Sequence, residues 1–201
     1  MMVQTGSMRV LEILAEATNV IAEGEVLQLM NMHDASLDEV GYLKVIRSKT
    51  AKLFEASARL GAILAQCPRA IEEACATYGQ ALGTAFQIID DLLDYDGDIA
   101  EMGKNLGDDL REGKSTLPLI AALQRGTPEQ VAVIQDAIEQ GCTDNLDAIV
   151  QIVRSTGALQ ATREAALAEA KRAMSAAEQL PINPYSASLL KLSAQLLERR
   201  A

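Results

Sequence analysis

Hydrophobic residues recur every three or four positions along this chain, the spacing that places them on one face of an α-helix. No stretch shows the strict apolar and polar alternation that predicts a half-buried strand. The pattern predicts helices over about residues 7–32, 36–65, 68–95, 116–126, 127–141, 145–155, 158–180 and from 183 onward. The predicted fold class is therefore all-α, an array of antiparallel helices joined by short loops.

Local signals fix several of the predicted helix starts. Ser36 with Glu39 three residues later is a capping-box pattern for the second helix. Pro68 suits the first turn of the third helix, and the segment 127–130 (Thr-Pro-Glu-Gln) combines a cap, a proline and a capping box. Residues 96–115 are polar and contain four glycines, which predicts a connecting loop that can close over a site.

The third predicted helix carries the most informative residues. Gln87, Asp90, Asp91 and Asp94 lie at offsets of three, four and seven, so they form one polar stripe on a helix that is otherwise apolar in this region. An ordinary solvated acidic face would have other polar neighbours, but these four are the only strongly polar residues between 86 and 95. The stripe should therefore face an internal cavity. Clustered buried carboxylates must protonate, pair with cations or bind metal, and oxygen ligands suit Mg²⁺, so Asp90, Asp91 and Asp94 are predicted metal ligands.

Basic residues near this stripe predict the second half of the site. Lys49 and Thr50 lie in a basic helix segment that, taken alone, is typical of a solvated face. Lys104 and Lys114 lie on the glycine-rich loop that follows the aspartates. Aspartates that bind Mg²⁺, surrounded by lysines, would form a receptor for a polyphosphate. The sequence has no Walker-type loop, which argues against a P-loop nucleotide site.

Composition limits the other possibilities. The 201 residues are 49% hydrophobic, enough for one core, so residues 1–201 are predicted to belong to one domain. A net charge of −10 argues against nucleic acid and anionic membranes as partners. No apolar run is long enough to cross a bilayer, and the three cysteines, which we interpret as core thiols, fit a reducing compartment. We expect a soluble, cytoplasmic protein without stable membrane insertion.

The segment 83–94, Gly-Thr-Ala-Phe-Gln-x-x-Asp-Asp-x-x-Asp, resembles the second aspartate-rich region of trans-type polyprenyl diphosphate synthases. The resemblance continues in 103–109 (Gly-Lys-Asn-x-Gly-x-Asp), upstream in Gly24-Glu25-x-x-Gln28 and Lys49-Thr50, and downstream in 112–118 (Glu-Gly-Lys-x-Thr-Leu-Pro). Within the family the chain looks most like the octaprenyl diphosphate synthases. It resembles their C-terminal portion.

The resemblance implies an isoprenoid-synthase-like helical bundle around a central cavity. It implies a Mg²⁺-dependent prenyltransferase that condenses isopentenyl diphosphate with an allylic diphosphate, as in the synthesis of a quinone side-chain precursor. By this likeness Lys49, Lys104 and Lys114 would hold diphosphate, Thr50 and Gln87 would be polar partners, and Lys49, Gln87 and Lys104 would take part in catalysis. It also implies a homodimer, which the apolar faces of the helices at 7–32 and 36–65 favour as well.

The sequence departs from the family pattern in one respect. The family's first aspartate-rich motif and its basic residues for isopentenyl diphosphate belong upstream of the residues present here. The bundle is therefore expected to be incomplete on its N-terminal side, and the chain alone is expected to elongate an allylic diphosphate only slowly. Two alternatives remain: a class I terpene cyclase, which shares the ionisation chemistry, and a non-catalytic fragment or subunit of such a synthase.

Overall fold

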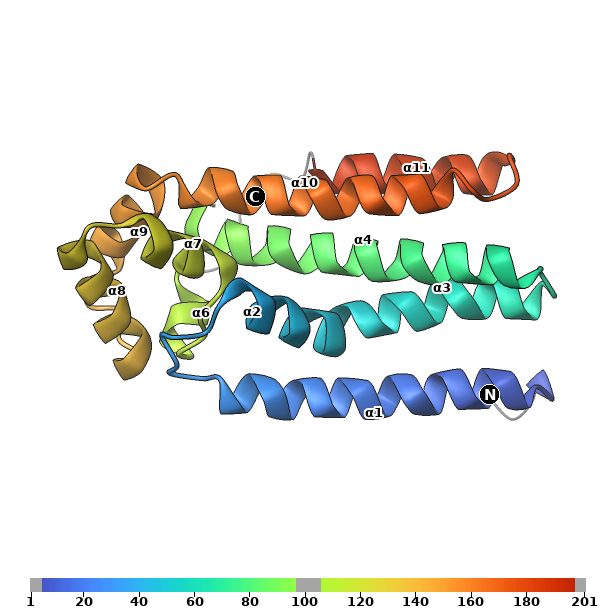
Figure 1. Ribbon diagram of the computed structural model, residues 1–201, viewed down its shortest axis with the longest axis horizontal. Helices are drawn as coiled ribbons and strands as arrows, with labels where there is room; N and C mark the ends of the chain where they lie inside the picture. The colour runs from blue at the N-terminus through green and yellow to red at the C-terminus, as the bar shows by residue number, and fades with distance from the viewer. Residues whose placement is uncertain (1–4, 97–105, 198–201) are drawn as a thin grey trace.

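A computed structural model describes residues 5–96 and 106–197, which form helices and the turns that connect them, without any strand (Figure 1). The predicted all-α class is thus confirmed. In chain order the elements are α1 (Met8–Met30), α2 (Glu39–Ile46), the π-helical turn η2 (Arg47–Ala51), α3 (Lys52–Leu64), α4 (Arg69–Asp96), α6 (Asp108–Arg111), α7 (Leu117–Arg125), α8 (Pro128–Gln140), α9 (Leu146–Ser155), α10 (Ala158–Ala177) and α11 (Pro184–Leu197).

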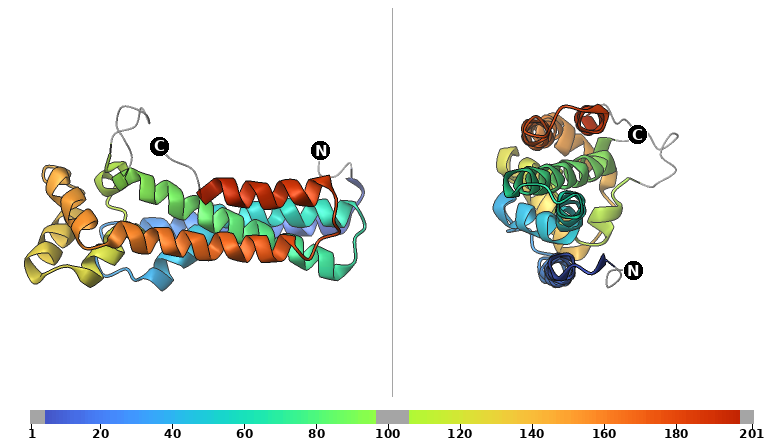
Figure 2. Two further views of the ribbon diagram at one scale, coloured as in Figure 1. Left: turned by 90° about the horizontal axis from the view of Figure 1, so that it is seen from above. Right: turned by 90° about the vertical axis from the view of Figure 1, so that its right-hand side faces the viewer.

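The long helices run side by side, and α4 lies at the centre between α3 and α10 (Figure 1). Helix α1 lies at one edge of the bundle and packs mainly against α2, η2 and α3, while its Arg9 forms an ion pair with Glu72 of α4 (Figure 2). The shorter helices α6 to α9 gather at one end, beside the C-terminal end of α4 (Figures 1 and 2). This places the acidic end of α4 between the α1–α2 connection and α6.

Most predicted helix boundaries agree with the structure. Helix α4 spans 28 residues, as predicted, with its start and end each shifted by one residue. The capping box of α8 is present, because Thr127 Oγ1 accepts from Gln130 N at 3.4 Å while Thr127 N donates to Gln130 Oε1 at 2.9 Å.

The predicted capping box at Ser36 is wrong. Helix α2 begins at Glu39, and its cap is Asp38, whose Oδ1 accepts from Gly41 N at 2.8 Å. Ser36 instead forms a local turn, in which its hydroxyl donates to Asp34 Oδ1 at 2.6 Å. Asp38, one position before the helix, accepts from a backbone N–H group in the first turn of α2, so Ser36 is not needed as the helix cap.

The predicted helix 36–65 is continuous but not regular. Residues 47–51 form a π-helical turn between α2 and α3. Such single-turn π-bulges cost hydrogen-bond geometry and occur often at functional sites. Here the turn contains Lys49 and Thr50.

Close helix contacts at glycines explain where this turn lies. A Cβ atom on Gly24 of α1 would lie 2.7 Å from the backbone N of Lys49, and one on Gly83 of α4 would lie 2.8 Å from Ala51 Cα. Only glycine permits these approaches, because any side chain would push the helices apart. The η2 turn is therefore held between α1 and α4.

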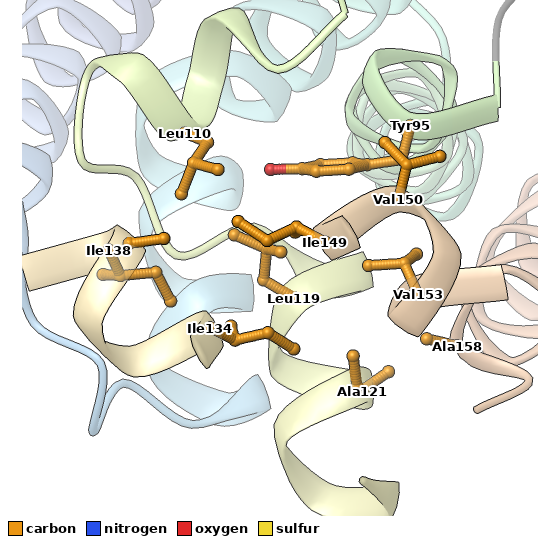
Figure 3. Packing of buried hydrophobic residues seen from close by; sticks show 12 residues of the cluster. Tyr95, Leu110, Leu119, Ala121, Ile134, Ile138, Ile149, Val150, Val153 and Ala158 are labelled. Carbon is orange, nitrogen blue, oxygen red and sulfur yellow. The ribbon is translucent and has the colours of Figure 1, made fainter. Parts of the chain in front are cut away.

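Three clusters of buried hydrophobic residues form the core. One joins α2, the C-terminal half of α4, α7 and α10, and another is an alanine-rich contact of α4 with α10 and α11. The third fills the end of the bundle, where Tyr95 and Leu110 point toward the side chains of α7, α8 and α9 (Figure 3). Tyr95 belongs to α4 and Leu110 to α6, so this cluster holds the C-terminal end of α4 and the short helix α6 together.

Two composition-based expectations can be compared with the described residues. In the described part of the chain, no helix is both long enough and apolar enough to cross a membrane. The cysteines Cys67, Cys75 and Cys142 are free thiols, but all three are only half-buried, so their interpretation as core thiols is wrong. Cys67 and Cys142 lie just after the ends of α3 and α8, and Cys75 lies on a partly exposed face of α4.

Two glycine-to-alanine variants test the importance of the close helix contacts. On Gly79 of α4 a Cβ would lie 2.3 Å from the carbonyl O of Phe54, whereas on Gly61 of α3 it would meet nothing within 4 Å. We expect Gly79→Ala to lower the free energy of unfolding by about 1–3 kcal/mol through overpacking, and the control Gly61→Ala to raise it by about 0.5–1 kcal/mol through helix propensity. Urea unfolding measures both, and a Gly79→Ala protein as stable as the parent would contradict the packing described.

Candidate active site

A cavity of about 190 Å³ lies where α1, α2, η2, α4 and the segment after α6 meet. Its polar lining residues come from all of these elements, while its apolar walls come mainly from α2. The lining residues are Gln28, Asn31, Met32, Leu37, Tyr42, Val45, Ile46, Lys49, Thr50, Gln87, Asp90, Asp91, Asp109, Lys114, Ser115 and Thr116. The structure thus brings most of the predicted site residues together.

A chain of hydrogen bonds crosses the cavity from η2 to α2. Thr50 Oγ1 donates to Gln87 Oε1 at 3.0 Å, and Gln87 Nε2 donates to Asp91 Oδ1 at 2.8 Å. The other carboxylate oxygen of Asp91 accepts from the hydroxyl of Tyr42 at 2.6 Å. Gln87 is thereby fixed in one amide orientation, and Asp91 has a protein donor on each oxygen.

Asp91 is buried, and its environment disfavours its negative charge. Burial raises the pKa of Asp91 to about 7, and the negative charge of Asp109 acts in the same direction. The hydrogen bonds from Tyr42 and Gln87 oppose this increase in pKa but do not cancel it. Burial and the charge of Asp91 also raise the pKa of Tyr42 well above its ordinary value, so its hydroxyl remains a donor.

Asp94 occupies a different position from Asp90 and Asp91. Its two carboxylate oxygens accept from the backbone N–H groups of Asp108 and Asp109, each at 3.2 Å, so it satisfies the first free donors of α6. Burial, followed by the charge of Asp109, raises the pKa of Asp94 to about 6. Asp94 is not among the residues that line the cavity. Its predicted role as a metal ligand stays a prediction.

Asp90 completes the acidic side of the cavity. Among the described residues, no hydrogen-bond or ion-pair partner of its carboxylate is found. Asp91 lies beside it on α4, and Asp109 faces both from α6. Three carboxylates thus surround one space.

The two described lysines of the predicted site are paired with carboxylates. Lys49 Nζ lies 3.0 Å from Glu25 of α1, and Lys114 Nζ lies 2.9 Å from Asp109 and 2.8 Å from Glu112. Burial works to lower the pKa of Lys114, but its hydrogen bonds with Glu112 and Asp109 outweigh burial, so the net pKa is above the ordinary value. The ammonium group of Lys114 is therefore charged at neutral pH. Lys104 lies outside the described residues.

The donor set fits a hydrated divalent cation that an anion helps to bind. Among the described residues, no group of three or more carboxylate, histidine or cysteine side chains forms a ready-made metal cage. Burial is the main cause of the raised pKa of Asp91, but the negative charges of Asp109 and Asp90 contribute to it, and a cation between these carboxylates would relieve that repulsion. Mg²⁺ binds in this way, through one or two carboxylates, waters and substrate phosphates.

Residues 1–154 match the polyprenyl synthetase family. The chain belongs to this family. It is 50% identical over 200 residues to the octaprenyl diphosphate synthase of Escherichia coli K12, a match that covers 99% of this chain and 62% of that protein. It is 42% identical over 199 residues to the all-trans-nonaprenyl-diphosphate synthase (geranyl-diphosphate specific) of Rhodobacter capsulatus, which covers 99% of this chain and 61% of that protein.

Solved structures of polyprenyl synthases have the same fold. The polyprenyl synthase of Caulobacter crescentus CB15, solved with calcium and isoprenyl diphosphate, superposes with a TM-score of 0.93 at 44% identity, covering 100% of this chain and 62% of that one. The decaprenyl diphosphate synthase of Rhodobacter capsulatus gives a TM-score of 0.92 at 44% identity, with the same coverage. The isoprenoid-synthase-like bundle and the predicted family are confirmed. The chain spans about 62% of the length of these curated and solved polyprenyl synthases.

Sequence reasoning did not assign a role to Asp109 or Tyr42. Asp109 lies in the quoted segment 103–109, but its place in a predicted loop gave no indication that it would face α4. Tyr42 lies seven residues before Lys49, two helical turns away on the same helix face, and this spacing is the signal that could have identified it.

The raised pKa of Asp91 predicts a pH-dependent effect of Asp91→Asn. A carboxyl group whose folded pKa is about 7 instead of 3.8 stabilises the fold below about pH 4, and that contribution is lost as the pH rises toward 7. The variant cannot ionise, so we expect it to be more stable than the parent at pH 8 by about 1 kcal/mol, or about 2–4 °C in Tm, but not at pH 4. Thermal unfolding across this range measures the difference.

The matched control for that experiment is Asp136→Asn, an exposed carboxylate on α8. Its removal should leave the pH dependence of Tm unchanged. If the Tm of Asp91→Asn and the Tm of the parent change in parallel between pH 4 and pH 8, ionisation of Asp91 does not destabilise the fold, and the prediction is contradicted.

Proposed function

We propose that this chain forms the diphosphate-binding side of a polyprenyl diphosphate synthase site, in which isopentenyl diphosphate is joined to an allylic diphosphate. The observation that carries the proposal is the cavity in which Asp90, Asp91 and Asp109 face Lys49 and Lys114. Such a mixture of like-charged acids and nearby ammonium groups suits a polyanion bound together with metal. Family membership and the calcium and isoprenyl diphosphate bound by the Caulobacter crescentus synthase support the same assignment.

The residues divide into two groups by charge. Asp90 and Asp91 would hold Mg²⁺ directly or through water, with Asp94 and Asp109 completing the acidic side. Lys49, Lys114 and Lys104 would contact diphosphate oxygens, with Thr50 and Gln87 as neighbouring polar groups. The metal, when bound, would supply positive charge that stabilises the leaving diphosphate anion.

The reaction requires stabilisation of a leaving anion. The allylic C–O bond breaks with its electron pair going to diphosphate, and the double bond of isopentenyl diphosphate supplies the electrons of the new C–C bond before a proton is lost. Fixed ammonium groups around the diphosphate lower the free energy of this charge-separated state because they need not reorganise as the bond breaks. Lys49 and Lys114 both line the cavity, and each ammonium group is paired with a carboxylate, that of Glu25 and that of Asp109.

The hydrogen-bonded residues position the acidic groups. Tyr42 and Gln87 hold Asp91 from opposite sides, and Thr50 fixes Gln87 in turn. In the proposed site these contacts keep one carboxylate in a single orientation while its neighbour Asp90 is free of such donors among the described residues. Supporting contacts of this kind typically matter by factors of 10 to 100 in metal affinity, about 1.4–2.7 kcal/mol.

The test is calorimetric binding of Mg²⁺ with and without inorganic pyrophosphate. We expect Mg²⁺ to bind weakly alone and at least about tenfold more tightly with pyrophosphate, since each neutralises the charge of the other. Asp90→Asn should remove most of this gain, while Asp136→Asn, an exposed acid on α8, should not. Equal Mg²⁺ affinity with and without pyrophosphate would contradict the proposal.

Turnover by this chain alone is a separate question. The expectation that it elongates slowly stays a prediction, and incubation with Mg²⁺, farnesyl diphosphate and labelled isopentenyl diphosphate measures it against an intact family member. A chain that binds pyrophosphate with Mg²⁺ but forms no product would retain the proposed site without catalysing the complete reaction.

We also propose that two copies associate through α1. Val26, Leu29 and Met30 lie on one face near the end of that helix and are 56%, 65% and 75% exposed. Burying a shared apolar face is the usual basis of a symmetric dimer. We expect a dimer at micromolar concentration by sedimentation, weakened by Leu29→Lys but not by Ile182→Lys at an equally apolar site that is 101% exposed. A monomeric parent would contradict this proposal.

A further inference from the structure

His33 joins three segments that are distant in the sequence. It follows α1 in a left-handed backbone conformation, with φ of 63°. Its backbone N–H donates to the carbonyl O of Gly113 at 2.7 Å, and its ring Nδ1 lies 3.0 Å from the carbonyl O of Ile138 in α8. A carbonyl can only accept, so Nδ1 carries a proton and donates.

The imidazole ring packs against two glycines. A Cβ atom on Gly113 would lie 2.4 Å from His33 Cε1, and one on Gly141 would lie 3.0 Å from the same atom. Both glycines have positive φ, 73° and 60°, a conformation that side chains rarely adopt. The ring thus occupies the space that two side-chain-free turns leave open.

A second contact joins the same two segments. The hydroxyl of Ser115 donates to the carbonyl O of Asp34 at 2.7 Å. Lys114 therefore lies between two residues that are each bonded to the α1–α2 connection: Gly113, which accepts from His33, and Ser115, which donates to Asp34.

The side chain of Lys114 leaves this short segment toward the cavity. Its ammonium group lies 2.9 Å from Asp109 Oδ1 and lines the cavity with Asp90 and Asp91. Gly113 lies in the turn that follows α6, with φ of 73°, so a small rotation there would move the ammonium group of Lys114 by a larger distance. Contacts that fix the backbone of 113–115 therefore fix where this charge lies.

We infer that His33 is a positioning residue for Lys114, holding residues 113–115 so that the ammonium group faces the acidic cavity. This rests on the proposed function, in which Lys114 contacts diphosphate. His33 itself lies outside the residues that line the cavity, and it acts through the backbone of Gly113.

A matched pair of variants separates the ring from the backbone conformation. His33→Gly keeps the left-handed conformation without strain but removes the ring and its donor. His33→Asn also tolerates this conformation, and its Nδ2 can replace Nδ1 as donor to Ile138. We expect His33→Gly to weaken pyrophosphate binding in the presence of Mg²⁺ by about tenfold, and His33→Asn by no more than about twofold.

A double-variant cycle distinguishes positioning from general loss of stability. In a Lys114→Ala protein the addition of His33→Gly should cause no further loss of pyrophosphate affinity, because the group that His33 positions is already gone. The inference would be overturned if the losses of pyrophosphate affinity from His33→Gly and Lys114→Ala were additive in the double variant. It would also be overturned if His33→Gly alone bound pyrophosphate as tightly as the parent. If His33→Gly does not fold, His33→Asp replaces it, since its carboxylate has the shape of asparagine but cannot donate to Ile138.

Hydrogen exchange separates failure of this inference from failure of the proposed function. Backbone amides of residues 112–116 should exchange faster in His33→Gly than in the parent, and at the parent's rate in His33→Asn. This outcome supports the positioning role even if the parent binds no pyrophosphate, in which case the proposed function fails instead. Unchanged exchange in His33→Gly would overturn the inference whatever the binding result.

Discussion

The site depends on the η2 turn being held between two helices. Gly24 of α1 and Gly83 of α4 approach η2 from either side so closely that neither could carry a Cβ atom without a shift. A π-turn is less stable in isolation than regular helix, so it persists because tertiary contacts determine it. The same contacts fix the backbone of η2, from which the side chains of Lys49 and Thr50 reach the cavity. Close packing at Gly24 and Gly83 therefore determines where these two polar side chains lie.

The acidic end of α4 illustrates a conflict between stability and the proposed function. Asp91 is buried among like charges and would be more stable when protonated, but the proposed metal-binding role requires its ionised form. Tyr42 and Gln87 reduce this conflict by donating to both oxygens. The remaining unfavourable free energy is what a bound cation would remove, so metal binding and relief of electrostatic repulsion are the same event.

The helical framework could be predicted because it follows from local rules. Hydrophobic spacing located the long helices, and Thr127 with Gln130 located the start of α8 to the residue. Ser36 misled the prediction, since a capping-box pattern also occurs in turns and a better acceptor, Asp38, lay two residues further on. The η2 turn could not be predicted, because its cause is contact with Gly24 and Gly83, which are distant in the sequence.

The candidate site was predictable on α4 and only partly elsewhere. Asp90, Asp91 and Gln87 share a helix face, so spacing alone placed them together, whereas Asp109 reaches the cavity through a short helix that a glycine-rich sequence does not indicate. Asp94 shows the limit of the stripe argument. It lies at the correct spacing, but one further turn along α4 carries it past the cavity to the backbone N–H groups of α6.

The position of Asp94 connects the two parts of the acidic region. By accepting from the N–H groups of Asp108 and Asp109 it fixes the start of α6, and α6 then places the Asp109 carboxylate opposite Asp91. Tyr95 and Leu110, packed into one cluster, hold the same two helices together on the apolar side. A hydrogen-bonded contact and a hydrophobic contact thus act on adjacent residues of α4. The separation of the acidic groups is consequently set by the fold before any ligand arrives, which is the preorganisation that electrostatic catalysis requires.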